Sequence, residues 1–475
     1  MTPETLYAVV DQGSSSTKCA VMDSSGRIYA EASEKTPRRI HRDRLEVDAE
    51  AVGASVESLL DQVMRDHQVA AIGLACQRST CLVWDRESGR ALTQALSWQD
   101  TGQTARTEAL AEHASEVTER TGLRLSPHYA AVKLAALLSE IAGGRDRAAA
   151  GELVAGTLDA FLVHRLTGSP ATDPGHAGRT LLYNLSQGSW DPVLCRLFDI
   201  PASSLPTLRT TVGSWGNYRG LPLCAVAGDQ QAALVGHGGW QAGTVAVHFG
   251  TGAFVLAATG PRIQRHQGLL SAAMASTAGG RLFQLEGSVN SAGSAVDWIC
   301  NLTGESLAPW MDRELVPDEL PGIVPALAGL GAPWWQPRAR GLIRGLSTAT
   351  RGVDLVGGVL AGIAMRVVDN LEAMAAAGTR PTVLRVSGKL TRLAGLIGLI
   401  ADAARVPVEV SSQEETGLIG ICRLAAAGFE GNESPLLAAP AVSSRRDPQW
   451  SAARVSSVRD SWRELIAAAS TEESS

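Results

Sequence analysis

Apolar and polar positions alternate near the start of the chain in a pattern that predicts three strands. Residues 7–10 (YAVV) are apolar, a polar turn rich in glycine and serine follows, and residues 18–23 (KCAVMD) return to a largely apolar run. A DSSGR turn then precedes residues 28–33 (IYAEAS), whose alternation is again typical of a strand. The chain is therefore predicted to begin with a three-stranded meander.

The same pattern returns later in the chain. Residues 243–260 (GTVAVHFGTGAFVLAATG) are predicted to form a strand, a turn rich in glycine and threonine, and a second strand. Both hairpins carry hydroxyl side chains at the tip. Two hairpins of one design, separated by roughly half the chain, indicate two homologous halves rather than a short repeat.

Segments with helical spacing lie between and after these hairpins. Residues 49–67 are predicted to form a helix, and residues 69–76 a short apolar strand. In the second half, the pattern predicts a long helix over 353–378, a strand over 383–388 and a last helix over 451–470. This alternation predicts an α/β fold with mixed sheets.

The length of 475 residues predicts two large domains. A passage rich in proline, glycine and serine, residues 199–222, is predicted to be extended, and the hinge between the halves is predicted near Gly236 to Gly243. The final TEESS is expected to fray. The predicted units are an N-terminal domain, a C-terminal domain and a polar linker with a C-terminal helix, at residues 1–238, 239–431 and 432–475 respectively.

The composition of the chain indicates which kinds of molecule it binds. A net charge of -6 gives the chain no electrostatic reason to bind nucleic acid or an anionic membrane surface. No apolar run approaches the ~18 residues needed to cross a bilayer, so we expect a cytoplasmic protein whose partners are small molecules. The seven cysteines are scattered without a C-x-x-C pair, and they are predicted to be small buried thiols rather than zinc or redox groups.

The opening turn suggests phosphate chemistry. Gly13 and the hydroxyls of Ser14, Ser15 and Ser16 can donate hydrogen bonds to phosphate oxygens, and Lys18 adds a positive charge. Asp11, at the end of the strand, can hold a divalent cation. The same residues also fit an ordinary polar turn, because serine and glycine are common turn formers. The second turn, Gly250 to Gly252, favours the first interpretation, since two such hairpins facing each other can grip a polyphosphate.

Two further stretches end apolar runs with polar residues. In VAGDQQAALVG, a strand is predicted to end at Asp229, where a carboxylate can take the proton from an attacking alcohol. The alternative is a helix cap, because Asp is a favoured capping residue. In CQRSTCLVWD and ALSWQD, Arg78 and Trp98 can supply a cationic donor and an aromatic wall to a polyol, or serve only as structural residues at strand ends.

These residues resemble the FGGY carbohydrate kinases, most closely their glycerol kinase branch. DQGSSSTK is similar to the branch's DQGTTSSR, and QRSTCLVWD to its QRETTVVWD. The resemblance continues, in the family's order, to about Gly428. It is carried by the segments SWQD, GTLDAFLVHRLTG, AGDQQAALVG, FGTGAFVL, EGSVNSAGSAVDW and GLGAPWWQPRARGLIRGL.

The resemblance implies an actin-like ATPase fold, in which two ribonuclease-H-like domains with mixed sheets flanked by helices enclose a nucleotide cleft. It implies ATP as co-substrate, Mg²⁺ held at Asp11 and near Asp229, and Asp229 as general base. The implied nucleotide-binding residues are Gly13, Ser14, Ser15, Ser16, Lys18, Gly250, Thr251, Gly252, Gly293, Asp297, Gly388 and Lys389. The implied substrate-binding residues are Arg78, Ser79, Trp98, His128, Asp229, Gln230 and Phe254.

Several matched positions depart from the glycerol kinase pattern, among them Asp297, which stands where the branch has Gln. Ser79 stands where the branch has Glu, and His128 stands where it has Tyr, although a surface loop also explains a histidine there. Losing a carboxylate acceptor removes about 1.5 to 3 kcal/mol of charge-assisted hydrogen bonding and leaves room for a longer polyol or a ketose. Lys389 and Leu393 replace a glycine and an asparagine of the nucleotide loop, and they predict altered nucleotide binding.

The sequence therefore predicts an ATP-dependent kinase of a small polyol or sugar, a phosphotransferase with an alcohol acceptor. Two alternatives remain open. One is a true glycerol kinase with an altered pocket, and the other is a catalytically weak homologue that acts as a binding or regulatory protein. A homodimer is the family's common state.

Overall fold

The central strand of the first lobe is β1 (Tyr7–Gln12), whose apolar side chains pack in the cores on both faces of a sheet. The computed structural model describes residues 4–41 and 44–471, so the last four residues of the predicted frayed end lie outside it. The first-lobe sheet has, in spatial order, β14 (Asn217–Tyr218), β15 (Leu221–Gly228), β6 (Ala71–Cys76), β1, β2 (Ser16–Met22) and β3 (Ile28–Lys35). The predicted meander and the strand at 69–76 are confirmed.

The sheet of the second lobe repeats this design. Its order is β18 (Leu270–Thr277), β19 (Gly280–Val289), β17 (Ala253–Gly260), β16 (Val245–Phe249), β22 (Leu384–Gly388), β23 (Val408–Ser411) and β24 (Val442–Arg446). In each sheet the central strand pairs antiparallel with its hairpin partner and parallel with a later strand, β6 for β1 and β22 for β16. The repeated order confirms the duplication that the two hairpins predicted.

Helices cover the outer face of each sheet. The helix α1 (Ala49–Met64) starts at Asp48, whose carboxylate accepts from the backbone N–H of Ala51, and it buries Val52, Val56 and Leu60. It shares a core with α6 (Leu158–Thr167). In the second lobe, one core is formed with α10 (Gly293–Thr303), α11 (Gly352–Ala376), α12 (Ala394–Ala404) and α14 (Ala452–Thr471). The helices predicted at 49–67, 353–378 and 451–470 are confirmed.

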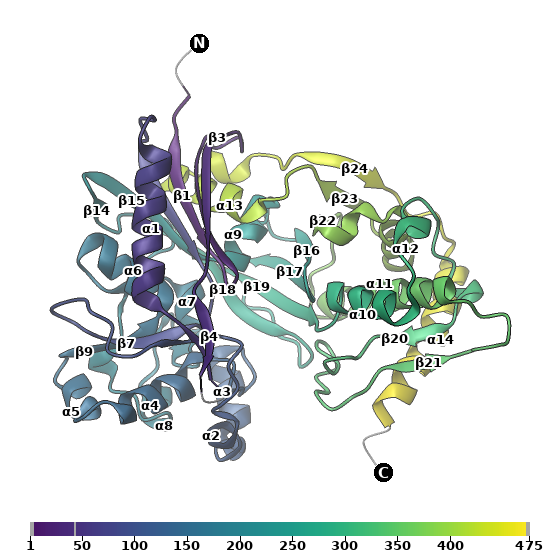
Figure 1. Cartoon of the computed structure of the whole chain (residues 1–475), viewed down its shortest axis with the longest axis horizontal. Helices are drawn as coiled ribbons and strands as arrows, with labels where there is room; N and C mark the ends of the chain where they lie inside the picture. Colours follow the sequence, from purple (N-terminus) through teal and green to yellow (C-terminus); the bar gives the residue numbers. More distant parts are fainter. Residues whose placement is uncertain (1–3, 42–43, 472–475) are drawn as a thin grey trace.

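The inner faces of the two sheets share a helix pair, α9 (Asp229–Gly236) and α13 (Thr416–Glu430). One core unites Tyr7 and Val9 of β1 with Ala246 of β16 and with both helices. Although α13 comes late in the chain, it lies beside β1 and β15 in Figure 1. Its residues fall in the predicted C-terminal domain by sequence, but they pack on the first-lobe sheet.

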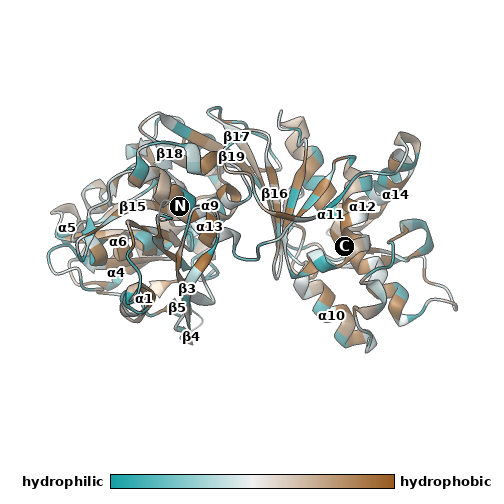
Figure 2. Cartoon of the chain, turned by 90° about the horizontal axis from the view of Figure 1, so that it is seen from above, coloured by the Kyte–Doolittle hydropathy of each residue, from teal (hydrophilic) through white to brown (hydrophobic). Residues whose placement is uncertain are grey.

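Glycines allow α9 and α13 to approach closely. A Cβ atom on Gly420 would overlap the carbonyl oxygen of Ala232, and one on Gly236 would overlap that of Thr416. Each helix therefore presents bare backbone to the other at the point of contact. Figure 2 shows β16, β17 and β19 between this pair and α11 of the second lobe.

A second, smaller sheet extends the first lobe. Its order is β4 (Arg38–His41), β5 (Arg44–Val47), β8 (Ala95–Leu96), β7 (Cys81–Asp85) and β9 (Leu153–Thr157). This part of the chain also contains α2 (Thr104–Glu108), α3 (Ala114–Thr121), α4 (Ala130–Glu140), α5 (Gly144–Ala149), α7 (Pro174–Ala177) and α8 (Pro192–Leu197). Helices α4 and α5 contact the small sheet, whereas α7 contacts β15 and β18. The passage predicted to be extended carries a short 3₁₀ helix (Ala202–Ser204) and the two-residue strands β13 (Thr207–Leu208) and β14 before β15.

Within residues 4–41 and 44–471, three segments cross between the lobes. Residues 237–244 join α9 to β16, residues 412–415 join β23 to α13, and residues 431–441 join α13 to β24. The first crossing overlaps the predicted hinge. Within the described ranges, no helix combines the length and the apolar character that a membrane crossing requires. All seven cysteines are free thiols, and all but Cys300 are buried.

The close contact at Gly420 predicts that one added methyl group lowers the stability of the protein strongly. We expect Gly420→Ala to lower the free energy of unfolding by about 2 to 3 kcal/mol, because the added Cβ would push α13 away from the Ala232 carbonyl. Chemical denaturation measures this change. The matched control is Gly398→Ala in α12, where a Cβ meets no atom within 4 Å, and it should be neutral or stabilising by up to about 1 kcal/mol. Equal stability of the two variants would contradict the prediction.

Candidate active site between the two lobes

The first predicted phosphate turn, residues 13–15, is held by a buried polar cluster. The backbone N–H of Gly13 donates to the carbonyl of Ser16 at 2.9 Å, and the Thr36 hydroxyl donates to the carbonyl of Gly13 at 2.8 Å. The amide of Gln12 also donates to the Gly13 carbonyl at 2.8 Å. These bonds fix the backbone and leave Ser15 exposed at the tip, where its hydroxyl is available to a ligand.

The second turn, residues 250–252, rests on the first turn of α10. The N–H of Gly293 donates to the carbonyl of Gly250 at 3.1 Å, and the N–H of Ala292 donates to that of Thr251 at 3.0 Å. A Cβ on Gly293 would lie 2.6 Å from the Gly250 oxygen, so glycine is needed for this close approach. Gly293 therefore supports the turn, and Asp297 is exposed one helical turn further on.

Acidic groups converge below the two turns. Asp11 lies at the end of β1, where Gly417 of α13 approaches so closely that a Cβ there would be 2.7 Å from its Oδ2. Burial raises the pKa of Asp11 to about 7, and the charges of Asp229 and Glu415 add to this rise. Lys18, predicted to contact phosphate, forms an ion pair with Glu415 from the opposite side. The site is thus rich in carboxylates that a cation would stabilise.

Asp229 is the first residue of α9, directly after β15. Its Oδ1 accepts from the backbone N–H of Gln230 at 2.8 Å and lies 3.6 Å from Nε of Arg78. The side chain is 26% exposed, so it is accessible to a ligand. The cap residue of α9 is Gly228, and no side-chain capping bond is formed there, which leaves the carboxylate free for another role.

A buried ion-pair network joins the lobes beside Asp229. Nη1 of Arg78 donates to Oε2 of Glu286 at 2.7 Å, and Nη2 donates to Oε1 at 3.3 Å. Arg179, which follows α7, donates to the same carboxylate. Burial alone would raise the pKa of Glu286, but the Arg179 and Arg78 guanidinium groups outweigh it and lower the pKa. Glu286 lies on β19, so this network fixes Arg78 from the second lobe.

Two predicted substrate-binding residues, Trp98 and His128, lie on neighbouring loops of the first lobe. Nδ1 of the exposed His128 donates to the carbonyl of Trp98 at 3.2 Å. The fully buried Lys133 clamps both loops, because its ammonium group donates to the carbonyls of Ser97 at 2.6 Å and His128 at 3.1 Å. Burial lowers the pKa of Lys133 to about 8.

Ser79 has a strained backbone. Its φ angle is 63°, in the left-handed region that costs a non-glycine residue roughly 1 kcal/mol or more. Its hydroxyl donates to the carbonyl of Arg179 at 3.2 Å. This hydrogen bond therefore ties Ser79 of the predicted pocket to the loop of Arg179, the second arginine that binds Glu286.

Gln230 and Phe254 complete the predicted pocket from the two lobes. The side-chain oxygen of Gln230 is buried and accepts no hydrogen bond from any residue in the described part of the chain. A buried acceptor without a donor is costly, so this oxygen suits a hydroxyl of a bound molecule. Phe254 is half-buried on β17, opposite His248 of β16.

The predicted nucleotide loop follows β22. Gly388 has a φ of 99°, and a Cβ there would overlap the carbonyl oxygen of Phe249, so only glycine fits. Lys389 is exposed at the start of a short 3₁₀ turn, which means that its side chain points away from the protein. Leu393 is buried in the second-lobe core. Its replacement of asparagine has therefore turned a polar position into a packing position.

A histidine with two carboxylates lies beneath the site. His176 Nδ1 donates to Asp173 at 2.8 Å and lies 3.5 Å from Asp159, and its Nε2 donates to the Cys76 carbonyl at 3.2 Å. Burial alone would lower the pKa of His176, but Asp159 and Asp173 raise it to about 9. All three side chains are fully buried, so the group is structural and holds the end of β6.

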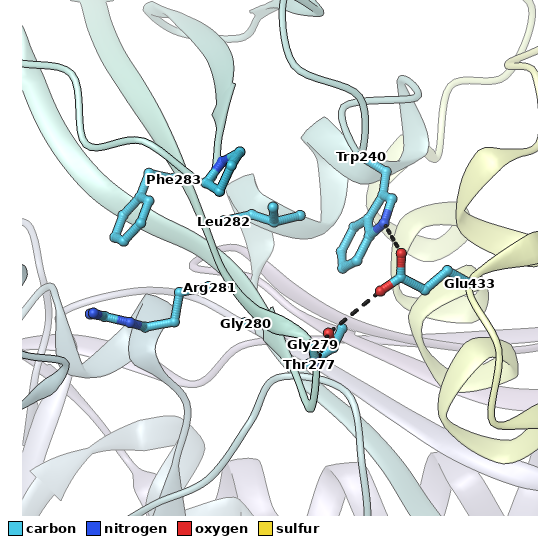
Figure 3. Close-up of a pocket in the computed structure, with 9 residues that line it drawn as sticks. Trp240, Thr277, Gly279, Gly280, Arg281, Leu282, Phe283 and Glu433 are labelled. Atoms are coloured by element: carbon cyan, nitrogen blue, oxygen red, sulfur yellow. Dashed lines mark hydrogen bonds between the residues drawn. The ribbon is translucent and has the colours of Figure 1, made fainter.

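One large cavity lies away from these residues. It has a volume of about 580 Å³ and is lined by residues of β18, β19 and two interlobe crossings, with Trp240, Arg281 and Glu433 among them. The indole N–H of Trp240 donates to Glu433 at 3.0 Å, and the Thr277 hydroxyl donates to it at 3.4 Å (Figure 3). None of the predicted site residues lines this cavity.

Sequence reasoning missed Arg179, Glu286, Lys133 and Glu415. Each is a charged side chain whose partner lies far away in the sequence, so no local pattern identifies it. A signal existed for Arg179 and Glu286, because both interrupt segments that are otherwise small and apolar, HAGRTLLY and LFQLEGSV. In the described part of the chain, no three His, Cys, Asp or Glu side chains are grouped so that they could hold a metal ion alone.

Comparisons with known proteins show which family the chain resembles in both halves. The model of the N-terminal domain of the FGGY family of carbohydrate kinases matches residues 6–236, and that of the C-terminal domain matches 245–429. The glycerol kinase of Alcanivorax borkumensis is 36% identical over 440 residues, 88% of each chain. That of Methylobacterium nodulans is 37% identical over 445 residues, 88% of this chain and 89% of its own.

Solved structures of two kinases share the fold. The glycerol kinase of Plasmodium falciparum with ADP has a TM-score of 0.90, with 23% identity over 99% of each chain. The xylulose kinase of Rhodospirillum rubrum has a TM-score of 0.86, with 19% identity over 98% of each chain. These likenesses confirm the two-domain, actin-like fold predicted from the sequence.

The buried His176 predicts a pH dependence of stability. The pKa of its imidazole rises from an ordinary 6.5 to about 9 on folding. The protonated ring therefore stabilises the folded protein fully below pH 6.5, and this contribution is lost as the pH rises through about 9. Between pH 6.5 and 9.5, the free energy of unfolding should fall by about 2 to 3 kcal/mol more than in His176→Gln. Urea denaturation at several pH values measures this, with the more exposed His113→Gln as control. Parallel curves for all three proteins would contradict it.

Proposed function

The chain belongs to the FGGY family of carbohydrate kinases, and from this membership we propose that it transfers the γ-phosphoryl group of ATP to a hydroxyl of a small polyol or sugar, with Asp229 as general base. The observation that carries the proposal is the position of Asp229. Its accessible carboxylate lies beside Arg78, and its charge acts on both Asp11 of the first hairpin and His248 of the second.

The reaction has one bond-forming and one bond-breaking event. The substrate hydroxyl oxygen attacks the γ-phosphorus and forms the new O–P bond, while Asp229 accepts the hydroxyl proton. The bond between the γ-phosphorus and the bridging oxygen breaks, and its electron pair leaves with ADP. No covalent enzyme intermediate is needed, so the protein acts mainly by positioning and electrostatics.

The two turns would hold the phosphates from opposite lobes. Residues 13–16 and Lys18 serve from the first lobe and residues 250–252 from the second, with Gly293, Asp297, Gly388 and Lys389 around the rest of the nucleotide. Lys18 would bind phosphate oxygens in place of, or beside, Glu415, since its ammonium group has three N–H donors and pairs with one carboxylate oxygen. Both side chains are about one-third exposed, so the pair is weak enough to allow this.

Asp11 fits a magnesium site. Its burial and the nearby charges of Asp229 and Glu415 disfavour its ionised form, and a divalent cation relieves this cost. Mg²⁺ is commonly bound by one or two carboxylates together with phosphate oxygens and water, which suits Asp11 with Asp229 nearby. When bound, the ion neutralises phosphate charge. Asp11 then orients it from the first lobe.

The acceptor alcohol would lie among Arg78, Ser79, Trp98, His128, Gln230 and Phe254. The unpartnered oxygen of Gln230 can accept from one substrate hydroxyl. Ser79 offers a short hydroxyl that already donates to the Arg179 carbonyl, so it leaves space rather than a charged acceptor. This supports a polyol longer than glycerol or a ketose as substrate.

Glycerol is the second candidate substrate. The relatives that are 36 and 37% identical to this chain are named glycerol kinases, and most residues of the predicted pocket match that branch. The two candidate substrates would differ only in their contacts with the acceptor pocket. The proposed base and the predicted phosphate turns would be the same for both. A panel of acceptors therefore separates them.

The role of Asp229 predicts a large loss of rate. In Asp229→Asn we expect kcat to fall by about 10² to 10⁴-fold, because the amide cannot accept the hydroxyl proton. ADP release is measured with glycerol, tetritols, pentitols and ketopentoses, and calorimetry checks that ATP binding is retained. Glu414→Gln, an exposed carboxylate paired with Arg392, is the control and should keep the wild-type rate. More than a tenth of the wild-type kcat in Asp229→Asn would rule out this base.

The pocket argument predicts a change of preference in Ser79→Glu. The kcat/KM for glycerol relative to that for the best longer acceptor should rise by about tenfold or more, because a carboxylate restores a charge-assisted acceptor. Ser79→Gln, similar in size but uncharged, is the control and should give a smaller change. A wild-type protein that already prefers glycerol would contradict the argument.

A further inference from the structure

His248 occupies in the second hairpin the place that Asp11 occupies in the first. β1 ends at Gln12 before the turn at 13–15, and β16 ends at Phe249 before the turn at 250–252. Asp11 is the penultimate residue of β1, and His248 is the penultimate residue of β16. Each strand is central in its sheet, paired antiparallel with its hairpin partner and parallel with β6 or β22. The duplicated fold therefore places a histidine opposite the proposed magnesium holder.

The alternation along β16 turns His248 toward the first lobe. Val245, Val247 and Phe249 lie in the second-lobe core, whereas Ala246, on the same face as His248, packs in the core around α9 and α13. Across the hairpin His248 faces Phe254. A Cβ on Gly250 would lie 3.9 Å from Nε2 of His248. The imidazole thus lies between the acceptor pocket and the second phosphate turn.

A hydrogen-bond chain fixes the orientation of this ring. Its Nδ1 lies 3.0 Å from the hydroxyl oxygen of Ser387, which in turn lies 3.1 Å from Nε2 of the buried His237. Ser387 directly precedes Gly388 of the predicted nucleotide loop. No residue in the described ranges hydrogen-bonds Nε2 of His248. Its half-buried ring therefore has one nitrogen held by the protein and one available to a ligand.

The imidazole rings of His237 and His248 are both neutral near pH 7. Burial, with added repulsion from His248 and Arg385, lowers the pKa of His237 to about 3. Burial also lowers the pKa of His248, although the charges of Asp229 and Glu415 oppose this. A neutral imidazole carries one N–H. When the Ser387 hydroxyl donates to Nδ1, the N–H of His248 is at Nε2.

We propose that His248 donates a hydrogen bond from Nε2–H to an oxygen of the γ-phosphoryl group, both in bound ATP and during its transfer. The proposal rests on the kinase function proposed above. His248 keeps its proton throughout, because the proton of the substrate hydroxyl goes to Asp229 and the leaving electron pair goes to ADP. A neutral donor in the second lobe complements the cation held near Asp11, since negative charge on the phosphoryl oxygens is then met from both sides.

A pair of substitutions separates this donor from simple packing. His248→Asn retains a polar group near Nδ1 that can bond Ser387, but it lacks the Nε2 donor. His248→Gln places an amide N–H near the position of Nε2. His266→Asn, on the loop before β18, is a matched control outside the site. The three variants and wild type are compared by thermal unfolding, by calorimetry with ATP and with ADP, and by steady-state kinetics.

The expected result is a selective loss in His248→Asn. Its kcat should fall about 10- to 100-fold and its affinity for ATP about fivefold, while affinity for ADP and KM for the acceptor stay within about twofold. His248→Gln should recover most of the rate. His266→Asn should match wild type in every measurement.

Two results would overturn the proposal. One is an Asn variant whose rate and ratio of ATP to ADP affinity stay within about twofold of wild type, and the other is equal loss in the Asn and Gln variants, which indicates packing. If wild type transfers no phosphoryl group to any acceptor, the proposed function fails. The ratio of ATP to ADP affinity then still decides the role of His248, because it needs no turnover.

Discussion

The close contact between α9 and α13 is the interaction on which the rest of the structure depends. Gly236 and Gly420 let the two backbones touch, and both sheets pack on the resulting pair. The contact also sets the chemistry, because α9 begins at Asp229 and α13 begins directly after Glu415. The two helix starts bring these carboxylates to Asp11. A wider separation of the helices would move Asp229, the proposed general base, away from the predicted phosphate turns.

Local sequence patterns were sufficient for the repeated parts of the fold. The apolar runs before each turn predicted β1, β2, β16 and β17, because hairpins combine strand alternation with short polar turns. The packing of α13 on the first lobe was beyond such patterns, since its partner glycine lies more than a hundred residues earlier in the chain. The same limit applies to the ion pair of Lys18 with Glu415.

The polar network around Glu286 illustrates why the pocket was only partly predictable. Its two arginines come from the first lobe and its carboxylate from the second, so the charges balance only after the lobes associate. Replacing one partner of such a buried group leaves an uncompensated charge and typically costs about 3 to 5 kcal/mol. Ser79, by contrast, was recognisable from its motif. Its positive φ and its bond to the Arg179 backbone were not.

The three interlobe crossings have a mechanical consequence. Two of them lie side by side, and the hydrogen bond from Trp240 to Glu433 ties them together on the wall of the large cavity. Covalent tethers at separate points resist twisting and sliding far more than they resist rotation about the line that joins them. If the two lobes move, such tethers favour rotation about a single axis. Along that path the two predicted phosphate turns would approach each other in the same register each time.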